Sequence, residues 1–73
     1  MSRKKYSLRD SDKLLRDVLD IEHGGVIFMV EKDDRVIAII SMCASVPGYA
    51  WYIMAMINML ADIDRDLLVT VIL

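Results

Sequence analysis

The sequence has little of what catalytic and metal sites are built from. It contains one cysteine, Cys43, and one histidine, His23, so no disulfide can form within the chain. It has no glycine-rich dinucleotide loop, no P-loop, no nucleophile elbow, no zinc-protease helix and no paired-cysteine motif. We therefore expect no enzymatic activity, no catalytic residue and no cofactor. Cys43 has apolar neighbours, which is typical of a small core residue.

A metal site is not expected either. Asp62, Asp64 and Asp66 have the alternating spacing that begins a calcium-binding loop. Such a loop needs Gly at its sixth position and Glu at its twelfth, where this chain has Leu67 and Leu73. The aspartates are instead expected to end a helix and to keep the next turn hydrated.

The sequence also lacks a large excess of charge of one sign. The formal net charge is -2, from nine Lys and Arg against eleven Asp and Glu, which does not favour binding to a nucleic acid polymer. The first residues are basic and are not followed by the apolar segment of a secretory signal. We therefore expect the protein to be cytoplasmic.

Hydrophobic residues are abundant instead. They make up 56% of the 73 residues, against the ~45–50% usual for soluble domains. A chain this short buries a smaller fraction of its surface than a larger domain does. The apolar surplus must therefore contact either lipid or another protein chain.

Residues 36–60 form a run without any charged side chain, long enough to cross a bilayer. A small membrane protein with a span at 36–60 is therefore one alternative. Pro47 and Gly48 divide the run, however, into a β-branched part and a part rich in helix formers. Trp51 also lies near the middle of the run rather than at an end, where membrane spans carry aromatics. We favour a strand followed by a buried helix and do not expect a membrane partner.

Local patterns predict a single α+β domain over residues 1–73, with α-β-β-α-β order and a three-stranded sheet with two helices. Ser7 as a helix cap, the glycines 24–25 and the apolar periodicities set the boundaries. The predicted segments are a basic tail (1–6), a helix (7–23), a β-hairpin (25–42), an apolar helix (49–63) and a strand (67–73). The last strand is expected to pair antiparallel with the first strand of the hairpin.

The hairpin is expected to be apolar on both faces. A turn of two residues or of four residues pairs Glu31 with Val36, and an unbroken register then puts Ile37 and Ile39 on the same face as Phe28. Two helices can cover only one face of the sheet. The other face must meet a partner.

We therefore predict a non-enzymatic interaction or regulatory protein, an obligate homo-oligomer and most simply a homodimer, that binds another protein. Asn58 within an apolar helix is typical of a residue that sets the register between helices. The residues expected at the oligomer interface are Trp51, Met54, Ala55, Asn58 and Met59. Whether the apolar helix or the free sheet face makes this interface stays open.

A second hypothesis is a small-molecule or nucleotide binder, such as a sequestering or inhibitory protein of the kind that phages use against host defences. Aromatic rings can stack on a base, and basic side chains can hold a phosphate. The residues expected in such a site are Lys4, Lys5, Tyr6, Arg9, Trp51 and Asn58.

Overall fold

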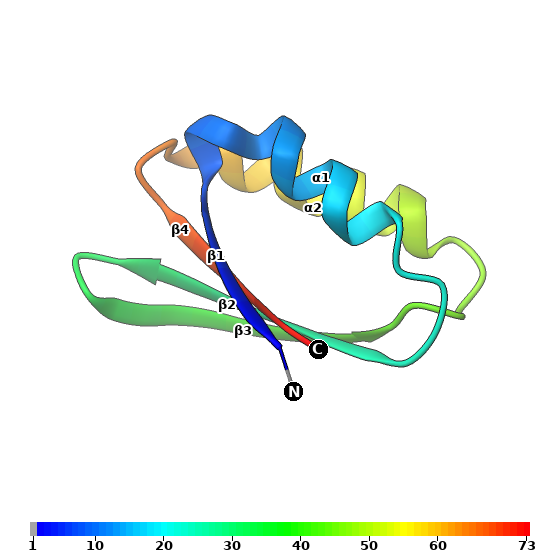
Figure 1. Ribbon diagram of the computed structural model, residues 1–73. Helices are drawn as coiled ribbons and strands as arrows, with labels where there is room; N and C mark the ends of the chain where they lie inside the picture. Colours follow the sequence, from blue (N-terminus) through cyan, green and yellow to red (C-terminus); the bar gives the residue numbers. More distant parts are fainter. Residues whose placement is uncertain (1) are drawn as a thin grey trace.

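The computed structural model describes residues 2–73, which form a layer of helices on one face of a sheet (Figure 1). The elements in chain order are β1 (Arg3–Ser7), a 3-10 turn (Leu8–Asp10), α1 (Ser11–Leu19), β2 (Gly25–Lys32), β3 (Arg35–Cys43), α2 (Tyr49–Ile63) and β4 (Leu68–Ile72). The apolar helix has the predicted bounds. The hairpin and the C-terminal strand lie within one residue of theirs.

The sheet has four antiparallel strands in the order β1-β4-β2-β3. The α+β class is thus confirmed, and so is the prediction that the last strand pairs antiparallel with the first strand of the hairpin, because β4 pairs with β2. β4 also pairs with β1. Both ends of the described chain therefore meet on neighbouring strands, where the backbones of Ser2 and Leu73 exchange hydrogen bonds of 3.2 and 2.9 Å.

The prediction of three strands is wrong by one, because the segment expected to be a basic tail forms β1. Its three consecutive basic residues, Arg3, Lys4 and Lys5, are all exposed, and charged side chains of this kind are common on edge strands. Tyr6 is the buried residue of β1, with 7% exposure, and it lies opposite Val69 of β4. The backbone of β4 thereby gains a partner on its second edge, which a chain of only three strands would leave open.

The first helix is shorter than predicted, spanning Ser11–Leu19 rather than residues 7–23. Ser7 does act as a cap, but for the 3-10 turn, where its hydroxyl accepts a hydrogen bond of 3.2 Å from the Arg9 amide. At the other end, the carbonyl of Val18 accepts hydrogen bonds from the Ile21 amide and the Tyr49 hydroxyl, each 3.2 Å. The chain then leaves the helix, and Ile21 packs against the core.

The hairpin closes with a two-residue turn at Asp33 and Asp34, which have φ values of 52° and 62°. This is the left-handed region that hairpin turns of the primed types require. Aspartate tolerates it better than most residues. Of the two turn lengths compatible with the sequence, the shorter one is therefore present, with Lys32 paired to Arg35.

A β-bulge changes which residues of β3 face the helices. Glu31 pairs with Val36 as predicted, but Val30 pairs with Ala38, so Ile37 is an extra residue without a partner. A slip of one residue moves every following side chain to the other face. Ala38, Ile40 and Met42 therefore pack toward the core, whereas Ile39 does not. The predicted placement of Ile37 and Ile39 beside Phe28 is wrong for this reason.

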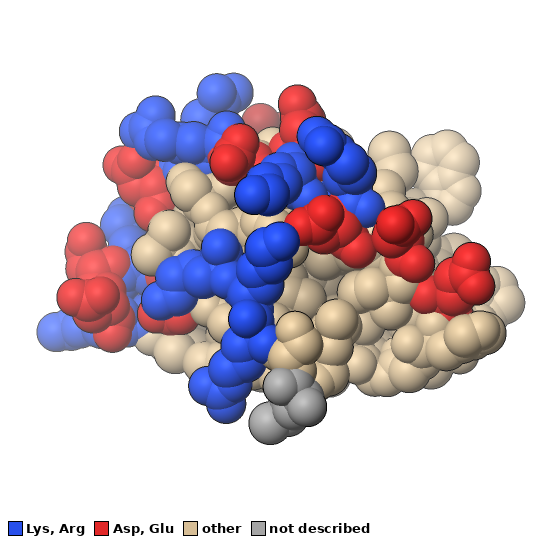
Figure 2. Space-filling model, viewed as in Figure 1, with Lys and Arg blue, Asp and Glu red and all other residues tan. Residues whose placement is uncertain are grey.

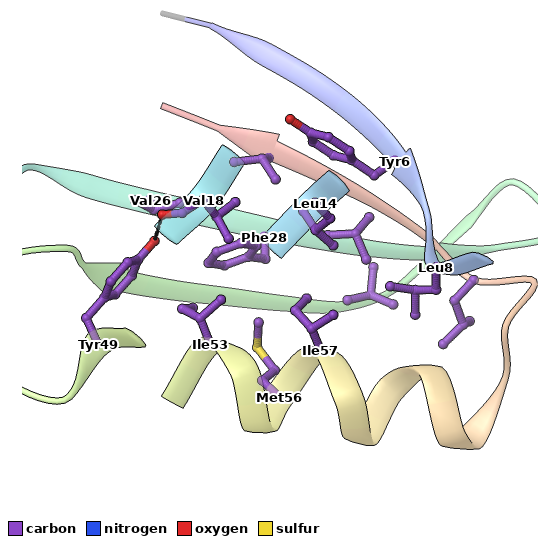
Figure 3. Packing of buried hydrophobic residues seen from close by; sticks show 14 of the residues in the cluster. Tyr6, Leu8, Leu14, Val18, Val26, Phe28, Tyr49, Ile53, Met56 and Ile57 are labelled. Atoms are coloured by element: carbon purple, nitrogen blue, oxygen red, sulfur yellow. Dashed lines mark hydrogen bonds between the residues drawn. The ribbon is translucent and has the colours of Figure 1, made fainter. Parts of the chain in front are cut away.

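The core lies between the sheet and the two helices (Figure 3). Val26, Phe28 and Val30 extend from β2 toward Ile53 and Ile57 of α2, and all five are completely buried. The other buried core side chains come from β1 and β4, from both helices and from the adjoining turns: Tyr6, Leu8, Leu14, Val18, Ala44, Tyr49, Met56, Leu67, Val69 and Val71.

The uncharged run at residues 36–60 is divided between β3 and α2, with the proline turn between them. Within residues 2–73, none of the helices is both long enough and apolar enough to span a bilayer.

Replacing a core side chain tests this layer arrangement. Phe28→Ala removes a ring with no solvent exposure and leaves a cavity, so we expect unfolding in urea to show a loss of about 3–5 kcal/mol. Trp51→Ala removes a larger ring that is 78% exposed and should change the stability by no more than about 0.5 kcal/mol. Similar losses in both variants would contradict the assignment of the core.

Candidate functional site

Two of the surfaces that expose apolar side chains are candidate sites, and the first is the face of the sheet turned away from the helices, here called the open face. Figure 1 shows both helices on the opposite side of the sheet. The strand registers and the alternation of burial assign the following side chains to the open face: Arg3, Lys5, Ser7, Ile27, Met29, Glu31, Val36, Ile39, Ser41, Cys43, Leu68, Thr70 and Ile72.

The apolar part of the open face becomes more exposed toward β3. Ile72 of β4 is 7% exposed, Ile27 of β2 is 37% exposed and Ile39 of β3 is 64% exposed. A single exposed isoleucine is ordinary, but several on neighbouring strands form a continuous patch, which is typical of an interaction surface. This finding fits the prediction that both faces of the hairpin are apolar.

The charged part of the open face lies at β1 and borders a hollow of about 300 Å³, here called the β1 trough. Its lining residues are Arg3, Lys4, Lys5, Met29, Glu31 and Thr70. Thr70 donates a hydrogen bond of 3.2 Å to Glu31, and the Lys5 ammonium lies 3.7 Å from the same carboxylate oxygen. In Figure 2, blue Lys and Arg side chains gather over β1 down to the end of the strand. The trough is thus polar beside an apolar patch.

The second surface is a groove between α2 and β3, here called the α2 groove, with a volume of about 250 Å³. Its lining residues are Ile40, Tyr52, Ala55, Met56 and Met59. Tyr52, Ala55 and Met59 follow one another at i, i+3 and i+7, so they form one stripe along the helix. Because β3 is an edge strand, the groove lies beside a sheet edge that carries no further strand in the described chain.

The two edges of the sheet differ in charge. β1 carries three consecutive basic residues, Arg3, Lys4 and Lys5, whereas residues 36–43 of β3 carry no charge. Charged side chains, lysine in particular, are a common means by which proteins prevent an edge strand from pairing with another chain. By this criterion β1 is protected and β3 is free to pair.

Some backbone groups of β3 point away from the sheet. The Ala44 amide donates to the Gly24 carbonyl at 2.9 Å. In an antiparallel pair of strands, successive residues point their amide and carbonyl groups alternately toward and away from the partner strand. Since the Ala44 amide points toward the β2 side, the residues one, three and five positions before Ala44 point away from it. These residues are Cys43, Ser41 and Ile39. The Cys43 carbonyl already accepts a hydrogen bond of 3.2 Å from the Val46 amide, so this edge of β3 offers three donors and the two carbonyl acceptors of Ile39 and Ser41 to another strand.

The structure brings together only part of the predicted oligomer interface. Ala55 and Met59 line the α2 groove. Trp51 and Asn58 are exposed on the outer surface of α2, and Met54 projects about 100° around the helix from Ala55. Ile40 and Tyr52 were not predicted. The spacing of Tyr52 with Ala55 and Met59 was a usable signal for the helix side of the groove, whereas the place of Ile40 depends on the bulge.

The residues predicted to bind a ligand do not form one site. Lys4 and Tyr6 face the helix layer, where the Tyr6 hydroxyl donates to Asp17 at 2.7 Å and the Lys4 ammonium lies 3.4 Å from the same carboxylate. Lys5 lies on the open face and Arg9 forms an ion pair of 2.6 Å with Asp66. Trp51 and Asn58 are on α2. Lys4 and Tyr6 thus lie together, with the Lys4 ammonium 5.6 Å from the centre of the Tyr6 ring, but the other predicted residues are separated from them, and the lining of the β1 trough contains no aromatic ring.

Cys43 is exposed at the end of β3, so the prediction of a core cysteine is wrong. The strand ends there, and the side chain lies on the open face. A hydrogen bond of 3.0 Å with the Ser45 hydroxyl lowers the pKa of the Cys43 thiol. Within residues 2–73, no group of three or more His, Cys, Asp or Glu side chains is placed to hold a metal ion.

Comparison with protein-family models, curated proteins and solved structures finds no match to this chain.

The contact between β1 and α1 has a measurable pH dependence. Burial, followed by the hydrogen bond to Asp17, raises the pKa of Tyr6 from 10.0 to about 12. The same hydrogen bond is the main cause of the lowered pKa of Asp17. A tyrosine whose pKa is higher in the folded than in the unfolded state stabilises the fold fully below pH 10, and this contribution is lost as the pH rises toward 12.

We expect Tyr6→Phe to lower the stability at pH 7 by about 1 kcal/mol, because the hydrogen bond of the hydroxyl is lost. The variant should also lose stability less steeply than the parent protein between pH 10 and 12. Urea unfolding at several pH values measures both effects. Tyr52→Phe removes the hydroxyl of a residue that is 51% exposed and is the control. An unchanged alkaline slope in Tyr6→Phe would contradict the assigned role of Tyr6.

Proposed function

We propose that the protein is a homodimer without catalytic activity that regulates another protein by binding to it. In this dimer, β3 of each copy pairs antiparallel with β3 of the other, and the two α2 helices pack against each other above the joined strands. The observation that carries the proposal is the difference between the sheet edges: one is protected by three basic residues and the other is apolar.

The backbone of β3 supports this pairing. The outward-facing groups of Ile39, Ser41 and Cys43 would exchange hydrogen bonds with the same groups of a second copy related by a two-fold axis, which is the commonest symmetry of protein dimers. A long apolar edge strand without a partner is an aggregation site in most soluble proteins. Pairing with a second copy removes this exposed edge.

The α2 groove supports the same dimer independently. Side-by-side β3 strands bring the groove of one copy against the α2 helix of the other. Met59, which is 58% exposed, and Tyr52, which is 51% exposed, would then lose contact with water. Burying apolar side chains of this size stabilises an interface by about 1.5–3 kcal/mol for each complete burial.

The size of this side of the molecule is compatible with a stable dimer. A specific interface buries at least about 600 Å² on each partner. The nine residues of β3 are roughly 30 Å long, and the shortest extent of the molecule is 18 Å. A flat side of these dimensions has an area of roughly 540 Å², just below this minimum, and projecting side chains add to the surface that a contact can bury.

Two substitutions test the dimer without touching the core. Met59→Lys places a charge in the α2 groove, and Ser41→Pro removes an outward-facing amide from an edge position where proline is tolerated. We expect light scattering and analytical ultracentrifugation to show a dimer for the parent protein at about 10 µM, where a dimer with a Kd in the low micromolar range or below is the main species. Both variants should be folded monomers at this concentration.

Trp51→Lys is the matched control, because it adds the same charge to the same helix at a side chain that is 78% exposed and does not line the groove. It should leave the dimer intact. A parent protein that is monomeric at about 10 µM would overturn the proposed dimer. A dimer that is lost in Trp51→Lys but kept in Met59→Lys would instead assign the interface to the outer surface of α2.

A further inference from the structure

The open face combines an apolar patch with a border of positive charge. Ile27 and Met29 of β2 and Ile39 of β3 form the centre of the patch, and Arg3 and Lys5 of β1 lie at its border. Neighbouring strands are ~4.8 Å apart, so β1 lies roughly 14 Å from β3. The border and the patch are therefore within reach of a single docked element.

Part of the positive charge at this border is not neutralised within the described chain. Lys4 forms an ion pair with Asp17 on the other face of the sheet, and Lys5 is near Glu31. Within residues 2–73, Arg3 has no carboxylate within ion-pair distance, and it lines the β1 trough. Arg3 and Lys5 against Glu31 leave one positive charge on this part of the face. A partner with negative charge at this position would complement it.

The dimensions of the face accommodate a helix as the docked element. A strand adds to the edge of a sheet, whereas a sheet face is covered by helices or by a second sheet. An α-helix with side chains is about 10–12 Å in diameter. A helix lying along β2 can therefore cover Ile27, Met29 and Ile39 while one of its flanks faces β1.

Two basic residues and one glutamate do not suit an anionic membrane, which is bound by clusters of four or more Lys and Arg. They also do not suit a nucleic acid, for which several phosphate contacts are needed. One acidic flank on a helix needs only one or two cations. The charge on the open face therefore fits a protein partner best.

We propose that the open face binds an amphipathic helix of another protein, with its apolar side on Ile27, Met29 and Ile39 and with Asp or Glu side chains on the flank that faces Arg3 and Lys5. This inference deepens the proposed function, because it names the class of partner that the dimer binds. In the dimer, the two apolar patches adjoin at the paired β3 strands and the two basic borders lie at the outer ends. Each copy thus binds its own helix.

The test uses a fluorescent synthetic peptide of about 18 residues, roughly 27 Å long as a helix, with a leucine stripe and glutamates along one flank. A second peptide has lysines in place of the glutamates. Fluorescence anisotropy measures the binding of each peptide to the full-length protein. We expect the acidic peptide to bind at least about tenfold more tightly than the basic one, and we expect added salt to reduce this difference.

Charge reversal at the border locates the contact. Arg3→Glu should weaken binding of the acidic peptide about fivefold or more and strengthen binding of the basic peptide. Lys13→Glu makes the same change in net charge on α1 and should alter neither affinity. Ile39→Ser should weaken both peptides, because it removes apolar contact area. Circular dichroism and urea unfolding of each variant verify that it is folded.

Equal affinity for the two peptides, no binding at about 1 mM protein, or equal effects of Arg3→Glu and Lys13→Glu would overturn the inference. The Met59→Lys variant separates this result from the dimer. If the inference is correct, the monomeric variant still binds one peptide per chain. Loss of peptide binding in folded Met59→Lys would assign the peptide to the α2 groove and overturn the inference, whereas the oligomeric state of the parent protein is measured independently.

Discussion

The pairing of β4 on both of its edges is the constraint on which the rest of the structure depends. The last strand of the chain lies between β1 and β2, and Val69 and Val71 extend from it into the core. Without β4, β1 would have no neighbour in the sheet, and Tyr6 would lose the strand that holds it against α1. The central position of β4 also leaves β1 and β3 as the edges. Because β1 is basic and β3 is apolar, the molecule has one protected edge and one open edge.

The same arrangement leaves much apolar surface of this hydrophobic chain outside its core. Both helices cover one face of the sheet, and the ion pairs Arg9–Asp66 and Lys32–Asp64 join neighbouring turns around that layer. Many of the exposed apolar side chains lie at the β3 edge, in the α2 groove and on the open face, which are the surfaces through which we propose that the protein pairs with itself and binds another protein. Others, such as Trp51 on α2 and Val46 in the turn before it, are exposed elsewhere.

Much of the fold could be predicted from local patterns, because α2 has a clear start at Pro47-Gly48 and the hairpin strands are rich in β-branched residues. Two features of the fold could not be predicted from local patterns. The run of Arg3, Lys4 and Lys5 resembles a solvated tail, and its strand forms only because β4 has a free edge far away in the sequence. The bulge at Ile37 depends on how two strands fit together, and no residue in this stretch signals it. Two residues that line the α2 groove, Ala55 and Met59, were among those predicted for an oligomer interface, because helical spacing is visible in a sequence. The groove itself was not predicted, since Ile40 reaches it only because of the bulge.

The central claim is that the open edge of β3 is paired with a second copy of the chain, and hydrogen exchange of individual amides tests it most directly. The amides of Ile39, Ser41 and Cys43 point away from β2, so only another strand can protect them. We predict slow exchange of these three amides in a concentrated solution and fast exchange after dilution to a concentration at which the dimer dissociates, while the amides of Ile40 and Met42, which face β2, stay protected in both. Fast exchange of all three outward amides at every concentration would contradict the account.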